Sequence, residues 1–188
     1  MKKRLEDYVI KFQGFLDKKF CNETIKQLKK NGWEDHYFNY SVTNENIKRS
    51  GNQELEISYQ QIPNKKIIMD KLFTAIASYQ KNLNFYWWNT WNGYTSIRFN
   101  RYTKTKKMAF HCDHIHTIFD GKRRGVPILS CLGALNDNYT GGEFVLFKDT
   151  VIELKQGELL IFPSSFLYPH KVEPVKKGKR YTYISWVW

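Results

Sequence analysis

The second half of the chain is a series of short β-rich runs, and this pattern restricts the fold more than any other feature. Eight runs rich in β-branched and aromatic residues follow Gly93. Turn-forming residues separate them, as in NDNYTGG, KQG, PSS and KKGK. The runs are TSIRFNRY (95–102), AFHCDH (109–114), PILSCLGALN (127–136), EFVLF (143–147), TVIELK (150–155), ELLIFP (158–163), HKVEPV (170–175) and RYTYISWVW (180–188). Eight short strands predict a double-sheet jelly roll.

The first half is predicted to be mostly helical. The segment 16–32 begins at a capping residue, Asp17, and ends in a Lys-rich turn before a glycine. A second helix is predicted over 64–82, because apolar residues recur there at helical spacing. These residues are Ile68, Leu72, Phe73, Ile76 and Tyr79. Between the helices, 36–42 predicts a strand and 43–54 a polar loop.

The length of 188 residues favours one domain with a substantial core. We therefore predict a single domain, 1–188. Residues 1–92 would form a helical backing segment with an early strand, and 93–188 the jelly-roll catalytic core. The predicted fold class is mainly β with helical backing, around a double-stranded β-helix (jelly roll, cupin-like) of eight strands.

The location of the chain is predicted to be cytoplasmic, without a membrane span. No apolar run approaches the roughly 18 residues of a spanning helix, and the basic start lacks the apolar segment of a signal peptide. The 3 cysteines are unrelated in spacing, which offers no disulfide framework.

The net charge of +12 raises the question of a nucleic-acid partner. The positive residues are 23 Lys and 7 Arg, whereas base and phosphate recognition favours the planar Arg fork. A solvated basic surface is therefore the favoured interpretation, and a nucleic-acid groove remains the alternative.

A candidate metal site lies in the stretch FHCDHIH (110–116). His111 and Asp113 are two residues apart, so at a strand end both side chains can point into one cavity. His170 follows at the start of a later run. Two imidazoles and one carboxylate form the facial triad that holds non-haem Fe(II) and leaves positions open. A buried polar pair is the alternative, as is a zinc hydrolase site that includes His114, although the further ligand of that pattern is missing.

Arg180 supports the interpretation of His111, Asp113 and His170 as a metal site. In the last run Arg180, Thr182, Ile184 and Trp186 share one face by period-two alternation. An inward Arg on a strand beside the metal-binding strand is suited to clamp a carboxylate. A dicarboxylic cosubstrate would then chelate iron with one end and meet Arg180 with the other. Thr182, on the same face, is a further candidate contact.

From about residue 97 to 188 the sequence resembles the prolyl 4-hydroxylase-like branch of the 2-oxoglutarate and Fe(II)-dependent oxygenases. The resemblance rests on RYTKTKKMAFHCD, LNDNYTGGEFVLF, LKQGELLIFPS and HKVEPVKKGKRYTYISW. It implies that His111, Asp113 and His170 bind iron and that Arg180 holds the far carboxylate of 2-oxoglutarate. It also implies a cosubstrate contact for the Tyr102 hydroxyl and a turn at Gly141 and Gly142.

The resemblance further implies the activity. Fe(II), 2-oxoglutarate and dioxygen would support hydroxylation of an unactivated C–H bond, with succinate and carbon dioxide as coproducts and ascorbate as a possible reductant. A prolyl residue in a peptide or protein is the first expected substrate. Two alternatives stay open: an oxygenase acting on nucleic acid or a ribosomal protein, and a binding module without iron.

The sequence departs from the family at two places. TKTKK follows Tyr102 where family members often have glycine, and Ala134 stands where some have a tyrosine that contacts the cosubstrate.

Other candidates keep more than one interpretation. His114 and His116 are expected at the rim of the site, and Cys112 as a small packed residue. The run Phe85–Tyr94 could be a stacking surface or helix-to-sheet core, with core favoured. Glu143 could be an acid at the core edge or a substrate contact.

Overall fold

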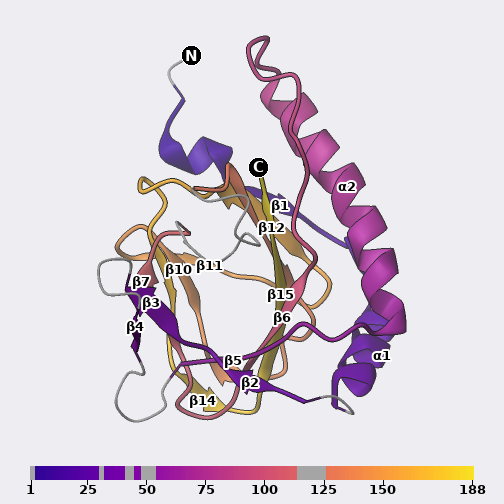
Figure 1. The fold of residues 1–188 in the computed structure, drawn as a ribbon, viewed down its shortest axis with the longest axis vertical. Helices are drawn as coiled ribbons and strands as arrows, with labels where there is room; N and C mark the ends of the chain where they lie inside the picture. Colours follow the sequence, from indigo (N-terminus) through magenta and orange to yellow (C-terminus); the bar gives the residue numbers. More distant parts are fainter. Residues whose placement is uncertain (1–2, 30–31, 41–44, 48–53, 114–125) are drawn as a thin grey trace.

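The fold was analysed in a computed structural model, which describes residues 3–29, 32–40, 45–47, 54–113 and 126–188. Two long helices, α1 (Lys18–Lys29) and α2 (Pro63–Leu83), precede most of the strands. Figure 1 shows three layers: the helices, a large sheet in the middle, and a smaller sheet on the far side.

The large sheet has the strand order β1-β12-β8-β15-β6-β5-β2. Its neighbouring strands are antiparallel throughout. The strands are β1 (Ile10–Phe12), β2 (Glu34–Asp35), β5 (Glu56–Ser58), β6 (Arg98–Tyr102), β8 (Leu129–Ala134), β12 (Leu159–Pro163) and β15 (Arg180–Val187). The central strands are buried on both faces, because helices cover one face and the small sheet covers the other.

The small sheet has the order β11-β10-β13-β7. Its strands are β7 (Met108–His111), β10 (Phe144–Leu146), β11 (Thr150–Ile152) and β13 (His170–Val172). Two further pairs lie outside these sheets. They are β9 (Thr140–Gly141) with β14 (Val175–Lys177), and β3 (Phe38–Tyr40) with β4 (Glu45–Ile47). The two facing sheets confirm the predicted jelly roll with helical backing.

The alternation along β15 separates two hydrophobic cores. Tyr181, Tyr183 and Val187 pack in the core between the large sheet and the helices. Ile184 and Trp186 pack in the core between the sheets. Because side chains of a strand alternate between faces, Arg180 and Thr182 also point between the sheets. The predicted period-two face is therefore present, and it faces the small sheet.

The helices follow the predicted segments closely. The backbone N–H of Phe20 donates to Asp17 Oδ1 at 2.7 Å, which caps the start of α1. Ile68, Leu72, Ile76 and Tyr79 of α2 are buried against the large sheet, as expected. Phe73, which belongs to the same helical pattern, is 55% exposed, and its ring contacts Trp91 with ring centroids 5.4 Å apart.

We expect Asp17→Ala to lower the free energy of unfolding by about 1 kcal/mol, because the first turn of α1 loses its side-chain acceptor. Urea unfolding monitored by circular dichroism measures this change. Glu23→Ala on the same helix is the matched control, because its ion pair with Lys26 is exposed and 3.7 Å long. Equal losses in the two variants would contradict the capping role.

Each of the eight predicted runs contains a strand, and the seventh contains β13 and the start of β14. The short strands β1, β2, β4, β5 and β9 were not predicted, and β4 corrects the predicted polar loop 43–54, because residues 45–47 pair with β3. The strand predicted over 36–42 is realised as β3, and its last residues, like most of the predicted loop 43–54, lie outside the described residues. Within the described residues no helix combines the length and apolarity that a membrane span needs.

Candidate active site

The three predicted ligand residues lie together on the small sheet. His111 ends β7 and His170 begins β13, and the two residues are direct partners in the antiparallel pairing. Asp113 follows β7 after one intervening residue. One ligand atom from each of the three lies within 4.8 Å of the others. The strand pairing therefore brings together His111 and His170, which are 59 residues apart in the sequence.

Backbone carbonyls orient both imidazoles. His111 Nδ1 lies 2.7 Å from the carbonyl oxygen of Ala109, and His170 Nδ1 lies 3.1 Å from that of Tyr168. Because a carbonyl can only accept, each Nδ1 must carry the proton and donate it. Each Nε2 then carries the lone pair through which an imidazole binds a metal, and it lies 3.5 Å (His111) or 3.7 Å (His170) from Asp113 Oδ1.

Asp113 is held by the large sheet. Its side chain is almost fully buried, and its Oδ2 accepts a hydrogen bond from Ser130 Oγ at 2.5 Å. Ser130 Oγ also lies 2.7 Å from Ser164 Oγ, so two hydroxyls of the large sheet support the carboxylate. These hydrogen bonds orient the Asp113 carboxylate so that Oδ1 points toward the two imidazoles.

The protonation states at neutral pH suit a divalent cation. Burial, and then the nearby His111, lower the pKa of His170 to about 4, although Asp113 opposes this. Burial by itself raises the pKa of Asp113, but His170, His111 and the Ser130 hydroxyl outweigh it and hold that pKa well below its usual range. A neutral imidazole and an ionised carboxylate are the forms that metals bind. The donor set fits Fe(II).

Arg180 lies on the inner face of β15 with a buried guanidinium. Its Cζ lies 4.9 Å from the ring centroid of Tyr102, its partner on β6. Its Nε donates to Tyr139 Oη at 3.2 Å. Its Nη1 is buried without a hydrogen-bond partner among the described residues, as is the hydroxyl of Thr182. Unsatisfied buried donors are costly, so a carboxylate ligand at this place fits the residues present.

The predicted turn at Gly141 and Gly142 makes room for this arginine. Gly142 has φ +68°, and a Cβ there would lie 3.2 Å from Arg180 Cδ and 2.9 Å from Val175 Cγ2. Only a residue without a side chain avoids both the strain and the crowding. The turn therefore allows the guanidinium to lie close to the backbone.

Tyr102 is a buried phenol beside Arg180. Burial raises its pKa, and the charges of Arg180 and Arg98 partly offset this effect. The hydroxyl is therefore neutral and able to donate a hydrogen bond at physiological pH. Ala134 pairs with Thr182 on the inner face, so no tyrosine hydroxyl reaches the cosubstrate region from that position.

The remaining candidates fall into separate places. Cys112 is half-buried. Burial, and to a smaller extent the negative charge of Asp113, raises the pKa of its thiol, which agrees with the predicted packed residue. Glu143 is exposed and lines a cavity of about 530 Å³ that Arg180 also lines. His114 and His116 lie outside the described residues.

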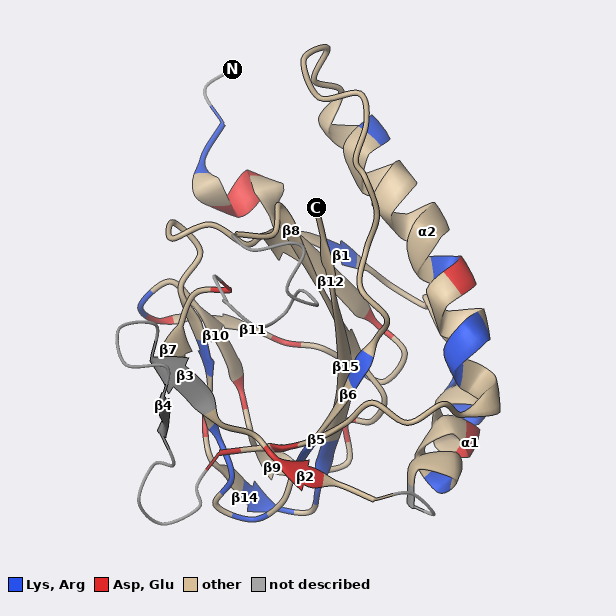
Figure 2. Ribbon diagram, viewed as in Figure 1, with Lys and Arg blue, Asp and Glu red and all other residues tan. Residues whose placement is uncertain are grey.

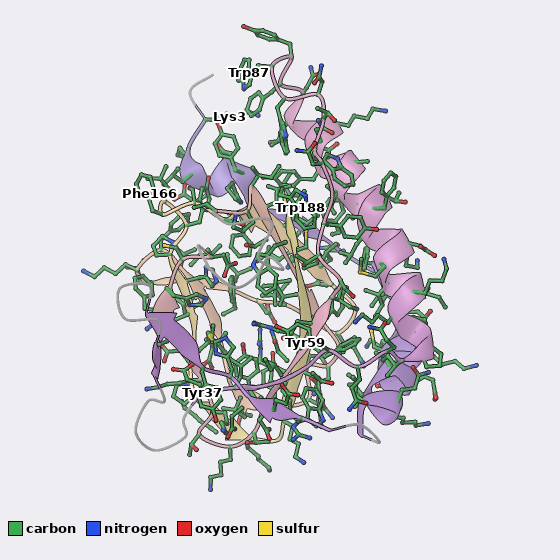
Figure 3. All side chains as sticks on the ribbon, viewed as in Figure 1. Lys3, Tyr37, Tyr59, Trp87, Phe166 and Trp188 are labelled. Atoms are coloured by element: carbon green, nitrogen blue, oxygen red, sulfur yellow. The ribbon has the colours of Figure 1, made fainter. Side chains whose placement is uncertain are left out.

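Part of the aromatic run Phe85–Tyr94 packs against the core, and part of it is exposed. Phe85, Trp88, Trp91 and Tyr94 pack on the core between helices and sheet. Tyr86 and Trp87 are 88% and 67% exposed. Figure 3 shows Trp87 at the top of the molecule, beyond the end of α2 and away from the sheets. The prediction that the run is core therefore holds for only part of it.

Sequence reasoning missed Arg98, Tyr139 and Ser130. Arg98 shares its face of β6 with Tyr102 by the alternation in RFNRY, so a period-two analysis of that run would have found it. Ser130 similarly alternates within β8. Tyr139 lies between strands, and no local pattern shows that it contacts Arg180.

Comparison with known proteins places the site in a family. Residues 97–188 match the model of the 2OG-Fe(II) oxygenase superfamily. A PKHD-type hydroxylase of Prochlorococcus marinus is 27% identical over 150 residues, 78% of this chain and 60% of that protein. Another from Idiomarina loihiensis is 35% identical over 95 residues, 48% of this chain and 41% of that protein. The chain thus spans less than two thirds of these relatives.

Solved structures share the fold. One is the viral collagen prolyl hydroxylase of Paramecium Bursaria Chlorella virus-1 in its 2OG complex, with a TM-score of 0.67 and 18% sequence identity. The alignment covers 96% of this chain and 94% of the viral chain. A Pseudomonas putida prolyl-4-hydroxylase has a TM-score of 0.64 at 16% identity and covers 95% and 91%. The residues that match this family model include all three members of the possible metal-ligating cluster, His111, Asp113 and His170. Residues 97–188, slightly less than half of the chain, are thus similar to the 2OG-Fe(II) oxygenase superfamily, and the relatives above are PKHD-type hydroxylases.

Proposed function

We propose that this protein is a 2-oxoglutarate- and Fe(II)-dependent dioxygenase that hydroxylates an unactivated C–H bond. One observation supports this most directly. A facial set of two imidazoles and a carboxylate lies in the same inter-sheet core as a buried arginine with an unsatisfied nitrogen. The first group suits Fe(II), and the second suits the far carboxylate of 2-oxoglutarate.

In this proposal His111, Asp113 and His170 hold the metal, and Arg180, Tyr102 and Thr182 bind the cosubstrate. Fe(II), when bound, supplies open coordination positions for 2-oxoglutarate and dioxygen and the electrons for oxygen activation, with ascorbate as a possible external reductant. The bidentate fork of Arg180 sets the direction of 2-oxoglutarate, and the Tyr102 hydroxyl donates to it.

The core around the site excludes water. The rings of Phe144 and Phe162 lie with their centroids 5.4 and 5.3 Å from that of His170. Trp186 is buried on the same inner face. A dry site strengthens the charge-assisted contacts of Arg180 and limits side reactions while 2-oxoglutarate is converted to succinate and carbon dioxide.

A prolyl residue in a peptide or protein is the proposed substrate. The support is the fold shared with prolyl hydroxylases, one of which, from Trichoplax adhaerens, was solved with a peptide fragment (TM-score 0.70, 18% identity, covering 96% of this chain and 83% of its own). The test is incubation of proline-containing peptides with protein, Fe(II) and 2-oxoglutarate. A peptide gaining one oxygen, with equimolar succinate, supports the proposal. Succinate release without modification of any proline peptide contradicts the prolyl assignment and leaves the oxygenase assignment in place.

We expect nucleic acid not to be the main substrate. Figure 2 shows Lys and Arg on α1, on α2 and around β14, so the positive charge is spread over several sides of the molecule. Lys104, Lys106 and Lys107 lie before β7, whereas the other predicted rim residues, Lys122, Arg123 and Arg124, lie outside the described residues. Single-strand binding measured over a salt series checks this expectation. Micromolar binding that falls steeply with salt, together with base oxidation, would favour the alternative oxygenase of nucleic acid.

A further inference from the structure

Arg98 is a second buried arginine on the inner face of the large sheet. In the antiparallel pairing of β6 with β15, Arg98 lies opposite Ile184. Tyr102 is on the same face of β6 as Arg98 and lies opposite Arg180. Because directly opposed residues of antiparallel strands point to the same face, Arg98 and Arg180 both point between the sheets. Arg98 is 6% exposed.

The two arginines lie at different levels of the sheet. Four residues separate Arg98 from Tyr102, which is about 13 Å along an extended strand. The Cζ of Arg98 lies 5.1 Å from the ring centroid of Trp186. Trp186 is the direct partner of Ser130, whose hydroxyl binds Asp113. Arg98 therefore lies at the level of the metal ligands, whereas Arg180 lies at the cosubstrate end.

Arg98 lacks an acidic partner in the described part of the chain. Its Nε donates to Asn100 Oδ1 at 3.0 Å, which leaves the two terminal nitrogens for another ligand. Arg101 on the opposite face differs: Glu56 accepts two hydrogen bonds from it, each 2.8 Å long. The buried acid Glu54 accepts a hydrogen bond from the backbone N–H of Ala109 at 3.4 Å. A buried guanidinium without an anion is costly, so a ligand carboxylate at Arg98 would offset that cost.

We propose that Arg98 binds a carboxylate of the oxidised substrate, so that the enzyme selects an acidic group beside the prolyl residue. This inference rests on the proposed function and narrows its substrate class. The far carboxylate of the cosubstrate is already assigned to Arg180, and the other would be neutralised by the metal. The terminal nitrogens of Arg98 are thus left for a substrate anion.

The test uses paired proline peptides that differ only in Asp or Asn at one of the flanking positions. Their binding is measured by calorimetry, without oxygen, to protein loaded with Fe(II) and 2-oxoglutarate. The wild type should bind one Asp peptide roughly tenfold or more tightly than its Asn partner. Arg98→Gln should remove that preference, and Arg98→Lys should restore part of it. Arg101→Gln, on the same strand, should keep it.

Three results would overturn the proposal. The first is equal binding of Asp and Asn peptides by the wild type at every position. The second is an Asp preference that persists in Arg98→Gln. The third is a weaker binding of 2-oxoglutarate by Arg98→Gln with unchanged peptide preference, because the recognised carboxylate would then belong to the cosubstrate. An Arg98-dependent preference without hydroxylation of any peptide supports this inference and contradicts prolyl hydroxylation.

Discussion

His170→Ala, His111→Ala and Asp113→Ala are each expected to abolish turnover, with a loss of at least roughly a hundredfold in succinate release. Each substitution leaves two of the three proposed Fe(II) ligands, and loss of even a supporting residue of a metal site costs about 10- to 100-fold. Iron content after anaerobic loading should fall with the activity. The measurements are metal analysis of the desalted protein and succinate release under saturating 2-oxoglutarate.

Cys112→Ala is the matched control, because Cys112 lies between two of the proposed ligands and its thiol contacts the Phe166 carbonyl at 3.6 Å. It should keep both iron and turnover. His114→Ala tests the competing zinc-type interpretation. Loss of metal in that variant, together with full activity of His170→Ala, would show that the proposed triad is wrong.

Arg180→Ala is expected to raise the apparent 2-oxoglutarate constant by roughly ten- to a hundredfold. The loss of a charge-assisted bidentate contact costs about 1.5–3 kcal/mol, and here the contact is buried. Iron binding should change little, because Arg180 is not among the ligating residues. Arg180→Lys should recover only part of the loss, because an ammonium replaces a planar fork. The constant is measured from succinate release, alongside iron content.

Tyr139→Phe completes this series. It removes the hydroxyl that accepts from Arg180 Nε while leaving the guanidinium in place. Loss of one neutral acceptor should weaken 2-oxoglutarate binding by less than tenfold. If Arg180→Ala lost iron but kept its 2-oxoglutarate constant, the clamp would be wrongly assigned. A Tyr139→Phe effect as large as that of Arg180→Ala would instead indicate that Tyr139 binds the cosubstrate itself.

Several features of the protein follow from local sequence. Alternation in RYTYISWVW determines that Arg180, Thr182 and Trp186 share a face, because successive side chains of a strand point to opposite sides. Asp17 determines where α1 begins through one short hydrogen bond. The spacing of His111 and Asp113 allows both to face one metal. These are interactions over a few residues, where the chain has little freedom to do otherwise.

Other features depend on which elements meet in space. The short strands β1 and β5 exist because β12 and β6 offer them pairing edges. Phe73 shares the helical spacing of the buried residues of α2, yet it is exposed and its ring contacts Trp91. Burial depends on the partner surface, and that surface is distant in sequence.

The candidate site shows the same division. The sequence by itself predicted the three candidate ligand residues, the arginine proposed to bind the cosubstrate and the strand alternation that directs Arg180 inward. Only the tertiary structure decided that His170 is paired with His111, that Ser130 supports Asp113, and that Arg98 lies beside Trp186, the strand partner of Ser130. The physical reason is that antiparallel pairing across many residues brings these groups together, and its register is set by the packing of two whole sheets.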